Sequence, residues 1–231
     1  MSEKTNENNK ENVNKNDGKP KEEKKSFSRE LIEWIICIVI ALSLALFIKY
    51  YIFTPTLVMQ ESMTPTILNG ERVLVNRLVR TFKLDLQRGD IVTFEAPSVY
   101  EMADGRITAT YYDVNGIINS FFYNVVESGK VSYIKRVIAL PGDHVEIKNG
   151  NVYVNEEKQD EGYLPEGLKT YIPEGGVPND FIVPEGYIFA MGDNREGSSD
   201  CRAFGCVPIE KVEGRVTIRI WPLNVFGGID K

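Results

Sequence analysis

Histidine is nearly absent from this chain of 231 residues, which contains one, His144. A Ser-His-Asp triad would depend on His144, which follows a Pro-Gly turn at the start of a predicted strand, an ordinary place for a surface histidine. The sequence also lacks a His-Glu-x-x-His motif and a Cys-x-x-Cys pair, which argues against a catalytic zinc site. Its three cysteines are too few for a disulfide framework in a chain this long.

An excess of basic charge is lacking as well. The chain has 27 Lys and Arg against 33 Asp and Glu, a net charge of −6. With no basic patch, we expect neither nucleic-acid binding nor binding driven by anionic lipid. Residues 1–30 lack large apolar side chains except Met1, Val13 and Phe27. Such a segment cannot bury enough surface to offset its ordering entropy, so we expect a disordered tail.

Charged residues disappear between Glu33 and Lys49, where Trp34–Ile48 is an apolar run. The 23 residues of 31–53 are enough to span a bilayer with some tilt. A cleavable signal peptide would have a shorter leading region, and a buried core helix would carry polar positions. We therefore predict a single transmembrane anchor at 31–53.

The flanks of this segment predict its orientation. Five basic residues shortly precede it: Lys19, Lys21, Lys24, Lys25 and Arg29. After them, only Lys49 comes before Arg72. Because cytoplasmic flanks carry the excess of Lys and Arg, the N-terminus is expected in the cytoplasm and residues 54–231 outside the cell membrane.

Beyond residue 53 the sequence changes to short runs rich in β-branched and aromatic residues, separated by turn residues. Asn149-Gly150 is a strong hairpin signal because both residues tolerate a positive φ, and Asn115-Gly116 is a second. The predicted strands are Arg72–Arg77, Asp90–Phe94, Val131–Leu140, Asp143–Ile147, Val152–Val154, Tyr187–Met191 and Val212–Ile220. The fold class is therefore mostly β, with a transmembrane helix before the domain at 54–231.

Two segments interrupt this predicted β core. Residues 97–130 are rich in Tyr and Phe and are predicted to form a hairpin excursion, whose aromatic side chains favour packing over function. Residues 155–185 are rich in Glu, Pro and Gly and are predicted to be a loop-rich appendage.

A serine hydrolase without a histidine base needs another one, and lysine can serve when burial lowers its pKa far below about 10.4. Lys135 lies in Tyr133–Leu140, the most hydrophobic of the predicted strands. Ser62 lies beside Pro65, and a loop dense in Gly, Asn, Asp and Ser covers 191–202. Taken singly, each has an ordinary structural explanation: an edge lysine, a turn serine and a hydrogen-bonded turn.

Taken together, these segments resemble the bacterial type I signal peptidases. Four motifs of that family occur in order: SMTPT at Ser62–Thr66, RGDIV at Arg88–Val92, YIKRVIALPGD at Tyr133–Asp143, and GDNR at Gly192–Arg195 followed by Ser198, Asp200 and Arg202. The resemblance implies an antiparallel β catalytic core with a smaller inserted β and loop subdomain.

The resemblance also implies a role for each matching residue. Ser62 would attack the scissile carbonyl, neutral Lys135 would take its proton, and Ser198 would orient the lysine head group. Two structural ion pairs would hold the loop against the lysine strand: Asp200 with Arg202, and Asp193 with Arg136.

The substrates implied are the signal peptides of exported pre-proteins, bound as an added strand and cut after small residues at −1 and −3. Membrane lipid would be the other partner, nucleic acid and metal would take no part, and no cofactor would be needed.

Two positions depart from the family pattern. Cys201 stands where serine is usual, and Gln60 stands where many members have serine or, in other lineages, glycine. A serine there gives the oxyanion hole its second donor, beside the Ser62 N–H. Gln60 would either donate its amide in that role or point to solvent. We expect Cys201 and Cys206 to be free thiols, although a fold-back of the loop would allow a bridge.

Two rival functions remain. A non-catalytic relative, a membrane-tethered chaperone for surface-protein or pilus assembly, would be expected to lose the serine or the lysine. A self-cleaving repressor would need a DNA-binding domain in place of the anchor, and residues 1–30 are too short and polar for one.

Overall fold

The structure is a computed structural model that describes residues 27–103 and 106–229. It begins with helix α1 (Phe27–Tyr51), and Glu30 lies in its first turn, where a carboxylate complements the helix dipole. Residues 27–30, predicted as the end of a disordered tail, are therefore helical. The rest of that predicted tail, 1–26, lies outside the described residues.

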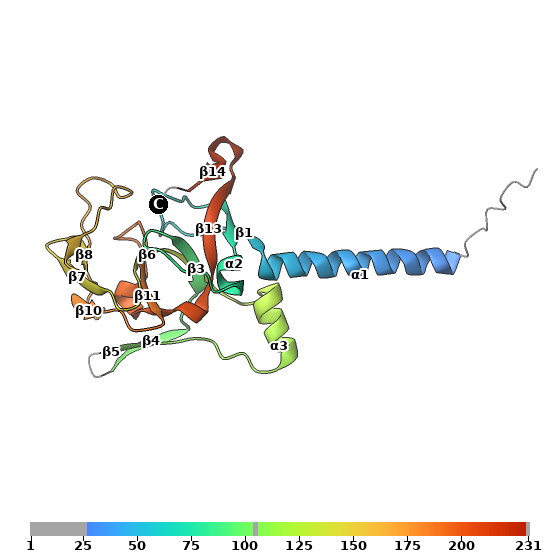
Figure 1. Ribbon diagram of the computed structural model, residues 1–231, viewed down its shortest axis with the longest axis horizontal. Helices are drawn as coiled ribbons and strands as arrows, with labels where there is room; N and C mark the ends of the chain where they lie inside the picture. The colour runs from blue at the N-terminus through green and yellow to red at the C-terminus, as the bar shows by residue number, and fades with distance from the viewer. Residues whose placement is uncertain (1–26, 104–105, 230–231) are drawn as a thin grey trace, which may run out of the picture. The chain divides into compact units, whose positions relative to one another are not determined.

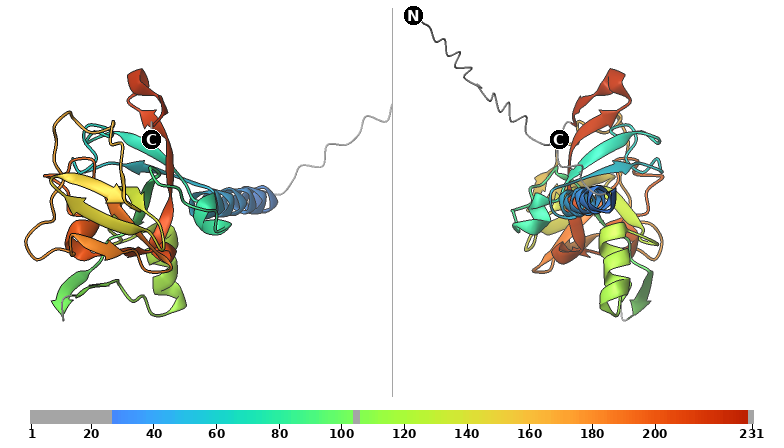
Figure 2. Two further views of the ribbon diagram at one scale, coloured as in Figure 1. Left: turned by 60° about the vertical axis from the view of Figure 1, so that its left-hand side comes forward. Right: turned by 90° about the vertical axis from the view of Figure 1, so that its right-hand side faces the viewer.

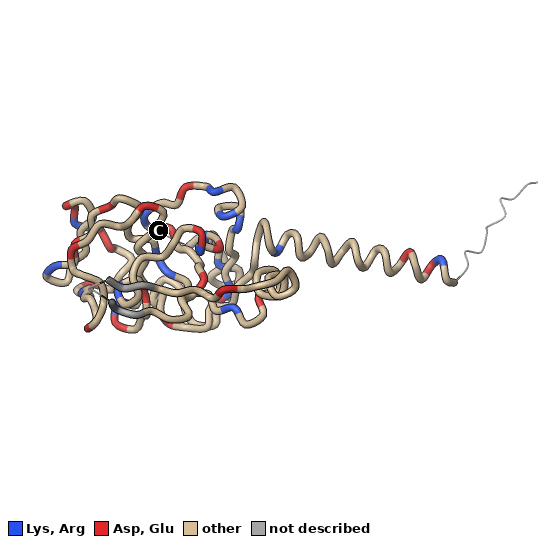
Figure 3. The backbone as a smooth tube through the Cα atoms, turned by 90° about the horizontal axis from the view of Figure 1, so that it is seen from below, with Lys and Arg blue, Asp and Glu red and all other residues tan. Residues whose placement is uncertain are grey.

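Helix α1 is long and apolar enough to cross a membrane, and an 18-residue window within it has a mean hydropathy of 2.8. Figure 3 shows that it carries charge only near its two ends. Thr54 donates a hydrogen bond to the Lys49 carbonyl at 2.7 Å, which satisfies one of the carbonyls left open at a helix end. Phe53, predicted within the anchor, already belongs to strand β1. The described residues divide into two compact units between Ala41 and Leu42, so the last turns of α1 belong to the second unit.

The second unit is built on one antiparallel sheet (Figure 1). Its strands follow the order β1-β2-β13-β3-β6-β11-β12, and β14 pairs with β13. Their bounds are β1 (Phe53–Leu57), β2 (Arg72–Asn76), β3 (Ile91–Glu95), β6 (Ser132–Ala139), β11 (Tyr187–Met191), β12 (Val207–Pro208), β13 (Val212–Trp221) and β14 (Gly227–Gly228). The predicted mostly β, antiparallel class is confirmed.

A smaller four-stranded sheet has the order β10-β7-β8-β9. Its strands are β7 (His144–Lys148), β8 (Asn151–Val154), β9 (Glu157–Lys158) and β10 (Asp180–Ile182). Asn149 and Gly150 both have positive φ, 54° and 80°, as a two-residue hairpin turn of the primed type requires. This predicted hairpin is confirmed. Most of 159–179, between β9 and β10, has no regular element.

The segment 97–130 contains a hairpin and a helix. Strands β4 (Val99–Ala103) and β5 (Arg106–Thr110) pair, and α3 (Ile117–Phe121) then continues into the π-helical turn η1 (Phe122–Val126). The predicted hairpin at Asn115-Gly116 is wrong. Of these two residues only Gly116 has a positive φ, 89°, and it caps α3 instead of turning two strands.

Two buried clusters join the strands into one domain. One is centred on Phe94, Val137, Phe189 and Phe204, and the other includes Met63 and Ile67, which follow Ser62 in the chain. Short helices occupy the connections: α2 (Leu78–Thr81), α4 (Cys201–Phe204), η2 (Ile209–Lys211) and η3 (Leu223–Val225). Figure 2 shows the domain from two further sides, with β13 running past its edge toward the β14 hairpin.

Candidate active site

Ser62 lies in a short turn that the second core cluster fixes from below. The neighbouring Met63 and the following Ile67 are fully buried, and the Ile67 N–H donates to the Met63 carbonyl at 2.9 Å. The Thr64 N–H donates to the Glu61 carbonyl at 3.1 Å. Because apolar anchors follow the serine, the turn is held tightly, and Ser62 is only 4% exposed.

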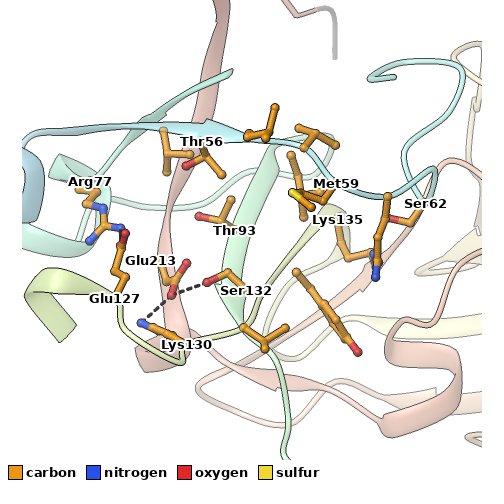
Figure 4. Close-up of a pocket in the computed structure, with 17 residues that line it drawn as sticks. Thr56, Met59, Ser62, Arg77, Thr93, Glu127, Lys130, Ser132, Lys135 and Glu213 are labelled. Carbon is orange, nitrogen blue, oxygen red and sulfur yellow. Dashed lines mark hydrogen bonds and ion pairs between the residues drawn. The ribbon is translucent and has the colours of Figure 1, made fainter. Parts of the chain in front are cut away.

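Lys135 lies in the middle of β6, paired with Val92 of β3. It is 2% exposed, and its Nζ lies 2.8 Å from Ser62 Oγ. Burial disfavours the ammonium form and lowers the pKa of Lys135 from 10.5 to about 8, while the nearby Asp200 carboxylate acts in the opposite direction. The structure thus joins the two residues predicted as nucleophile and base (Figure 4).

The loop after β11 is fixed by Asp200 and Arg202. The guanidinium of Arg202 donates two hydrogen bonds to the Asp200 carboxylate, each at 2.8 Å. The same carboxylate accepts the N–H of Gly192 at 2.9 Å and the N–H of Arg202 at 3.1 Å, which caps α4. Both side chains are buried, so Asp200 holds the beginning of the loop, at Gly192, against its end, at Arg202.

A second bidentate pair ties this loop to β6. Arg136 donates to the two carboxylate oxygens of Asp193 at 2.9 and 2.7 Å, and both side chains are fully buried. Thr66 donates to the same carboxylate at 2.5 Å and thereby links the serine segment to the pair. Sequence reasoning missed Thr66, although it stands inside the SMTPT motif.

Two further residues of the loop contact the serine segment directly. The Asn194 N–H donates to the Ser62 carbonyl at 3.0 Å, and its side-chain amide donates to the Glu61 carbonyl at 3.2 Å. A Cβ at Gly192 would overlap the Ser62 carbonyl oxygen and Ser198 Oγ, so a glycine is needed for this close approach. The Gly-Asp-Asn motif indicated a hydrogen-bonded loop, but it did not show which contacts these residues make with the serine segment.

Ser198 and Gln60 lie near the pair without being fixed to it. Ser198 Oγ is buried over Gly192 and has no hydrogen-bond partner within the described part of the chain. The structure therefore shows no hydrogen bond from Ser198 to Lys135. Gln60 is exposed and lines the cleft in front of Ser62, and no side-chain hydrogen bond fixes it among the described residues.

The other reactive side chains lie apart from this site or are shielded. His144 is on β7, where its Nε2 pairs with Asp180 at 2.6 Å. Cys201 and Cys206 are free thiols, and burial raises the pKa of Cys201 and raises that of Cys206 to about 12. Residues 27–103 and 106–229 contain no group of three or more His, Cys, Asp and Glu side chains placed to hold a metal ion.

A cleft of about 560 Å³ opens in front of the pair. One wall is 56–60 with Ser62, from the end of β1 onward, and the other is 130–135, which includes the first half of β6. Three strands separate β1 from β6 in the sheet order, so the sheet curls to bring both to one cleft. Among the residues that the structure describes, β1 pairs on one side only, and β6 meets β11 only from Arg136 onward. Two strand edges with open backbone groups thus face the cleft.

The end of the cleft away from Ser62 is charged (Figure 4). Lys130 pairs with Glu213 at 2.5 Å, and Arg77 pairs with Glu127. Ser132 also donates to Glu213, at 3.0 Å. Each buried charge has a partner of opposite sign, which offsets much of its desolvation. Nothing in the sequence marked these pairs, because their members are up to 83 positions apart.

Comparison with known proteins identifies the family. The family model described as "Signal peptidase, peptidase S26" matches residues 31–221. The chain belongs to this family. Signal peptidase IB of Staphylococcus aureus is 34% identical over 210 residues, covering 86% of this chain and 93% of its own. Signal peptidase I S of Bacillus subtilis is 35% identical over 210 residues, covering 88% and 96%.

A solved structure, a signal peptidase I from Enterococcus faecalis, is 26% identical and covers 58% of this chain and 97% of its own, with a TM-score of 0.37. That structural likeness adds nothing to the family assignment, which the sequence matches carry. As a member of family S26 the chain is a serine peptidase, a hydrolase. The family and the apolar helix α1 are together consistent with a membrane-anchored protein.

Proposed function

We propose that this chain is a membrane-bound endopeptidase that removes N-terminal signal peptides from exported pre-proteins, with Ser62 as nucleophile and Lys135 as general base. The observation that carries the proposal is the buried contact of 2.8 Å between Lys135 Nζ and Ser62 Oγ. A lysine whose pKa is lowered to about 8 is neutral in a useful fraction of molecules near neutral pH, as a base must be.

The reaction follows from this geometry. Ser62 Oγ attacks the scissile carbonyl carbon while Lys135 Nζ takes the hydroxyl proton. Lys135 then gives that proton to the leaving amine, which becomes the N-terminus of the mature protein, and an acyl ester stays on Ser62. Water attacks the ester, Lys135 takes its proton and returns it to Ser62, and the signal peptide leaves as a carboxylate.

The oxyanion that forms during attack needs donors aimed at it. The Ser62 N–H is one, since none of the hydrogen bonds in the described part of the chain uses it. Gln60 is the candidate for the second, because its unpaired amide lies in the same cleft two residues earlier. Ser198 stays a positioning candidate, because its Oγ and the Ser62 carbonyl oxygen both lie close against Gly192.

We infer that the substrate binds as an extended strand between the open edges of β1 and β6. Main-chain hydrogen bonds would give affinity, and pockets for alternate side chains would give specificity. Near Ser62 the cleft is lined by Val58, Met59 and Ile134, which suits small apolar side chains at −1 and −3. The N-terminus would be cytoplasmic, the apolar part of α1 would be the anchor, and the domain from β1 onward would be the extracytoplasmic catalytic domain.

A non-catalytic chaperone role is disfavoured, because such a protein has no use for a buried lysine against a buried serine. Burying an amine without a charged partner is destabilising, and a catalytic role accounts for its retention.

The test is cleavage of a secretory precursor by the full chain in detergent. Ser62→Ala and Lys135→Ala should each lower kcat by about 10³-fold or more, and the double variant should be little worse than either, because the two residues act as a unit. Ser199→Ala and Lys158→Met, at exposed positions, are the matched controls. If either alanine variant kept more than about a hundredth of the activity, the dyad assignment would be wrong.

A further inference from the structure

The helix formed by α3 and η1 (Ile117–Val126) is apolar, uncharged and exposed. No Asp, Glu, Lys or Arg occurs from Val114 to Val126. None of its residues is buried. Ile117 is 90% exposed and Ile118 is 72% exposed. An apolar helix of this length is ordinarily either a core helix or a segment at a membrane interface, and the exposure excludes the core.

The opposite side of this helix attaches it to the domain. The Tyr123 hydroxyl donates to Glu95 of β3 at 3.1 Å, and its ring stacks on Tyr112 with the centroids 5.8 Å apart. The helix therefore has an attached face and a free face. The free face carries five large apolar side chains, which are Ile117, Ile118, Phe121, Phe122 and Val126. A contiguous apolar surface of this kind on a folded protein marks an interaction site.

The helix lies beside the last turns of α1, within the same compact unit. Ser43, Leu46 and Phe47 of α1 line one hollow together with Ile117 and Phe121. Lys49 donates to the Val126 carbonyl at 3.3 Å and pairs with Glu127 at 3.1 Å. In Figures 1 and 2 the helix runs crosswise to these turns of α1. A helix crosswise to a spanning segment lies in the plane of the membrane.

We propose that Ile117–Val126 is a second membrane contact, an interfacial helix whose free face lies against the lipid of the bilayer that α1 spans. The inference rests on the proposed function, which places α1 in the membrane. Lipid is the occupant because the neighbours of Ile117 and Phe121 on α1 are themselves side chains of the spanning segment. Phe121 and Phe122 suit the boundary between head groups and acyl chains, and Lys49 reaches the polar layer from the end of α1.

This contact acts on the cleft, because the chain runs from the helix directly into the cleft wall. Glu127 and residues 130–135 line the cleft, and Glu127 is held by both Lys49 and Arg77. The lipid contact therefore holds one wall of the cleft at the membrane surface. A substrate segment that leaves the bilayer there would enter the cleft without crossing open water.

The first test measures the depth of the helix in the full chain, reconstituted in liposomes of phosphatidylcholine brominated in the upper acyl chain. In a Trp34→Phe, Trp221→Phe background, the tryptophan of Ile118→Trp should be strongly quenched. The matched control is Ile182→Trp on β10, which is 65% exposed, and its tryptophan should not be quenched. In a Trp221→Phe variant, Trp34 is the one tryptophan, and its quenching reports whether α1 is in the bilayer.

The readings separate the two proposals. Quenching of Trp34 without quenching of the Ile118→Trp tryptophan would overturn the interfacial helix and leave the anchor standing. An unquenched Trp34 would overturn both, since the helix has no bilayer to meet without the anchor.

The second test measures function. The Ile117→Asn, Ile118→Asn variant changes only exposed positions, so its fold should be retained. With a precursor embedded in liposomes its KM should rise about tenfold, which corresponds to about 1.4 kcal/mol. With a short soluble peptide in detergent, its kcat and KM should equal those of the unchanged chain, and Ile182→Asn should change neither assay. An equal loss in both assays, or no loss in liposomes, would contradict the proposal.

Discussion

Replacing Lys135 by methionine should stabilise the fold at neutral pH while abolishing catalysis. The pKa of Lys135 is lowered by burial from 10.5 to about 8. In the unfolded chain the same amine titrates near the ordinary value, so between pH 8 and 10.5 the unfolded state binds more protons than the native state. Stability therefore rises with pH across that window, and below it the native state carries the full destabilisation.

The magnitude follows from the two pKa values. A tenfold change in a protonation equilibrium is about 1.4 kcal/mol, so the lowering to about 8 corresponds to roughly 3 kcal/mol at pH 7. Methionine has a similar volume and no charge, but it loses the hydrogen bond to Ser62, worth about 1 kcal/mol. The net gain at pH 7 is about 2 kcal/mol, a rise in Tm of about 4–8 °C for a domain of this size.

The assay is thermal unfolding of the full chain in detergent, followed by near-ultraviolet circular dichroism at pH 7 and about pH 10.5. At the higher pH only about 0.4 kcal/mol of the protonation contribution remains, so Lys135→Met should be roughly 0.6 kcal/mol less stable than the unchanged chain. Lys158→Met, at an exposed position on β9, should change Tm at neither pH. A stability difference for Lys135→Met that is independent of pH would refute the reasoning.

Two further predictions concern catalysis. The value of kcat/KM should rise with pH along an acidic limb with an apparent pKa near 8, because only neutral Lys135 accepts the proton, and His144→Gln should leave that limb unchanged. A limb near pH 10.5 would show that Lys135 is not desolvated. Gly192→Ala should lower kcat by about 10²-fold, since its Cβ would displace the Ser62 carbonyl, while Gly228→Ala, which meets no atom, should keep full activity. Full activity of Gly192→Ala would show that the loop does not position Ser62.

The sheet was predictable where the signals are local. Strands such as Tyr187–Met191 and Val212–Trp221 combine β-branched and aromatic residues with flanking turn residues, and the structure has them at nearly the predicted bounds. The hairpin at Asn149-Gly150 was predictable for the same reason, since its signal is local. The Asn115-Gly116 prediction failed because the residues after it form a helix, which hydrogen bonds attach to Lys49 of α1 and Glu95 of β3. This tertiary context overrides the β preference of Phe and Tyr.

The site was predictable only in part. Ser62 and Lys135 are 73 positions apart, so their contact depends on how the sheet curls, which no local pattern records. The family resemblance assigned both residues their roles through the motifs, and it also predicted the ion pairs of Asp193 and Asp200. Thr66 and Asn194 were missed as partners, because a threonine or asparagine in a turn satisfies its own backbone as readily as that of a distant segment.

The arginines around Lys135 explain how its pKa falls although two carboxylates lie close by. Asp200 and Asp193 both raise the pKa of Lys135, yet each is already held by a bidentate guanidinium, that of Arg202 or Arg136. Arginine keeps its proton under all ordinary conditions, so these pairs remain closed when the lysine titrates. Arg202 also lowers the pKa of Lys135 by direct repulsion. Burial therefore prevails over the carboxylates, and the ion pairs that hold the loop in place also leave the proposed base free to lose its proton.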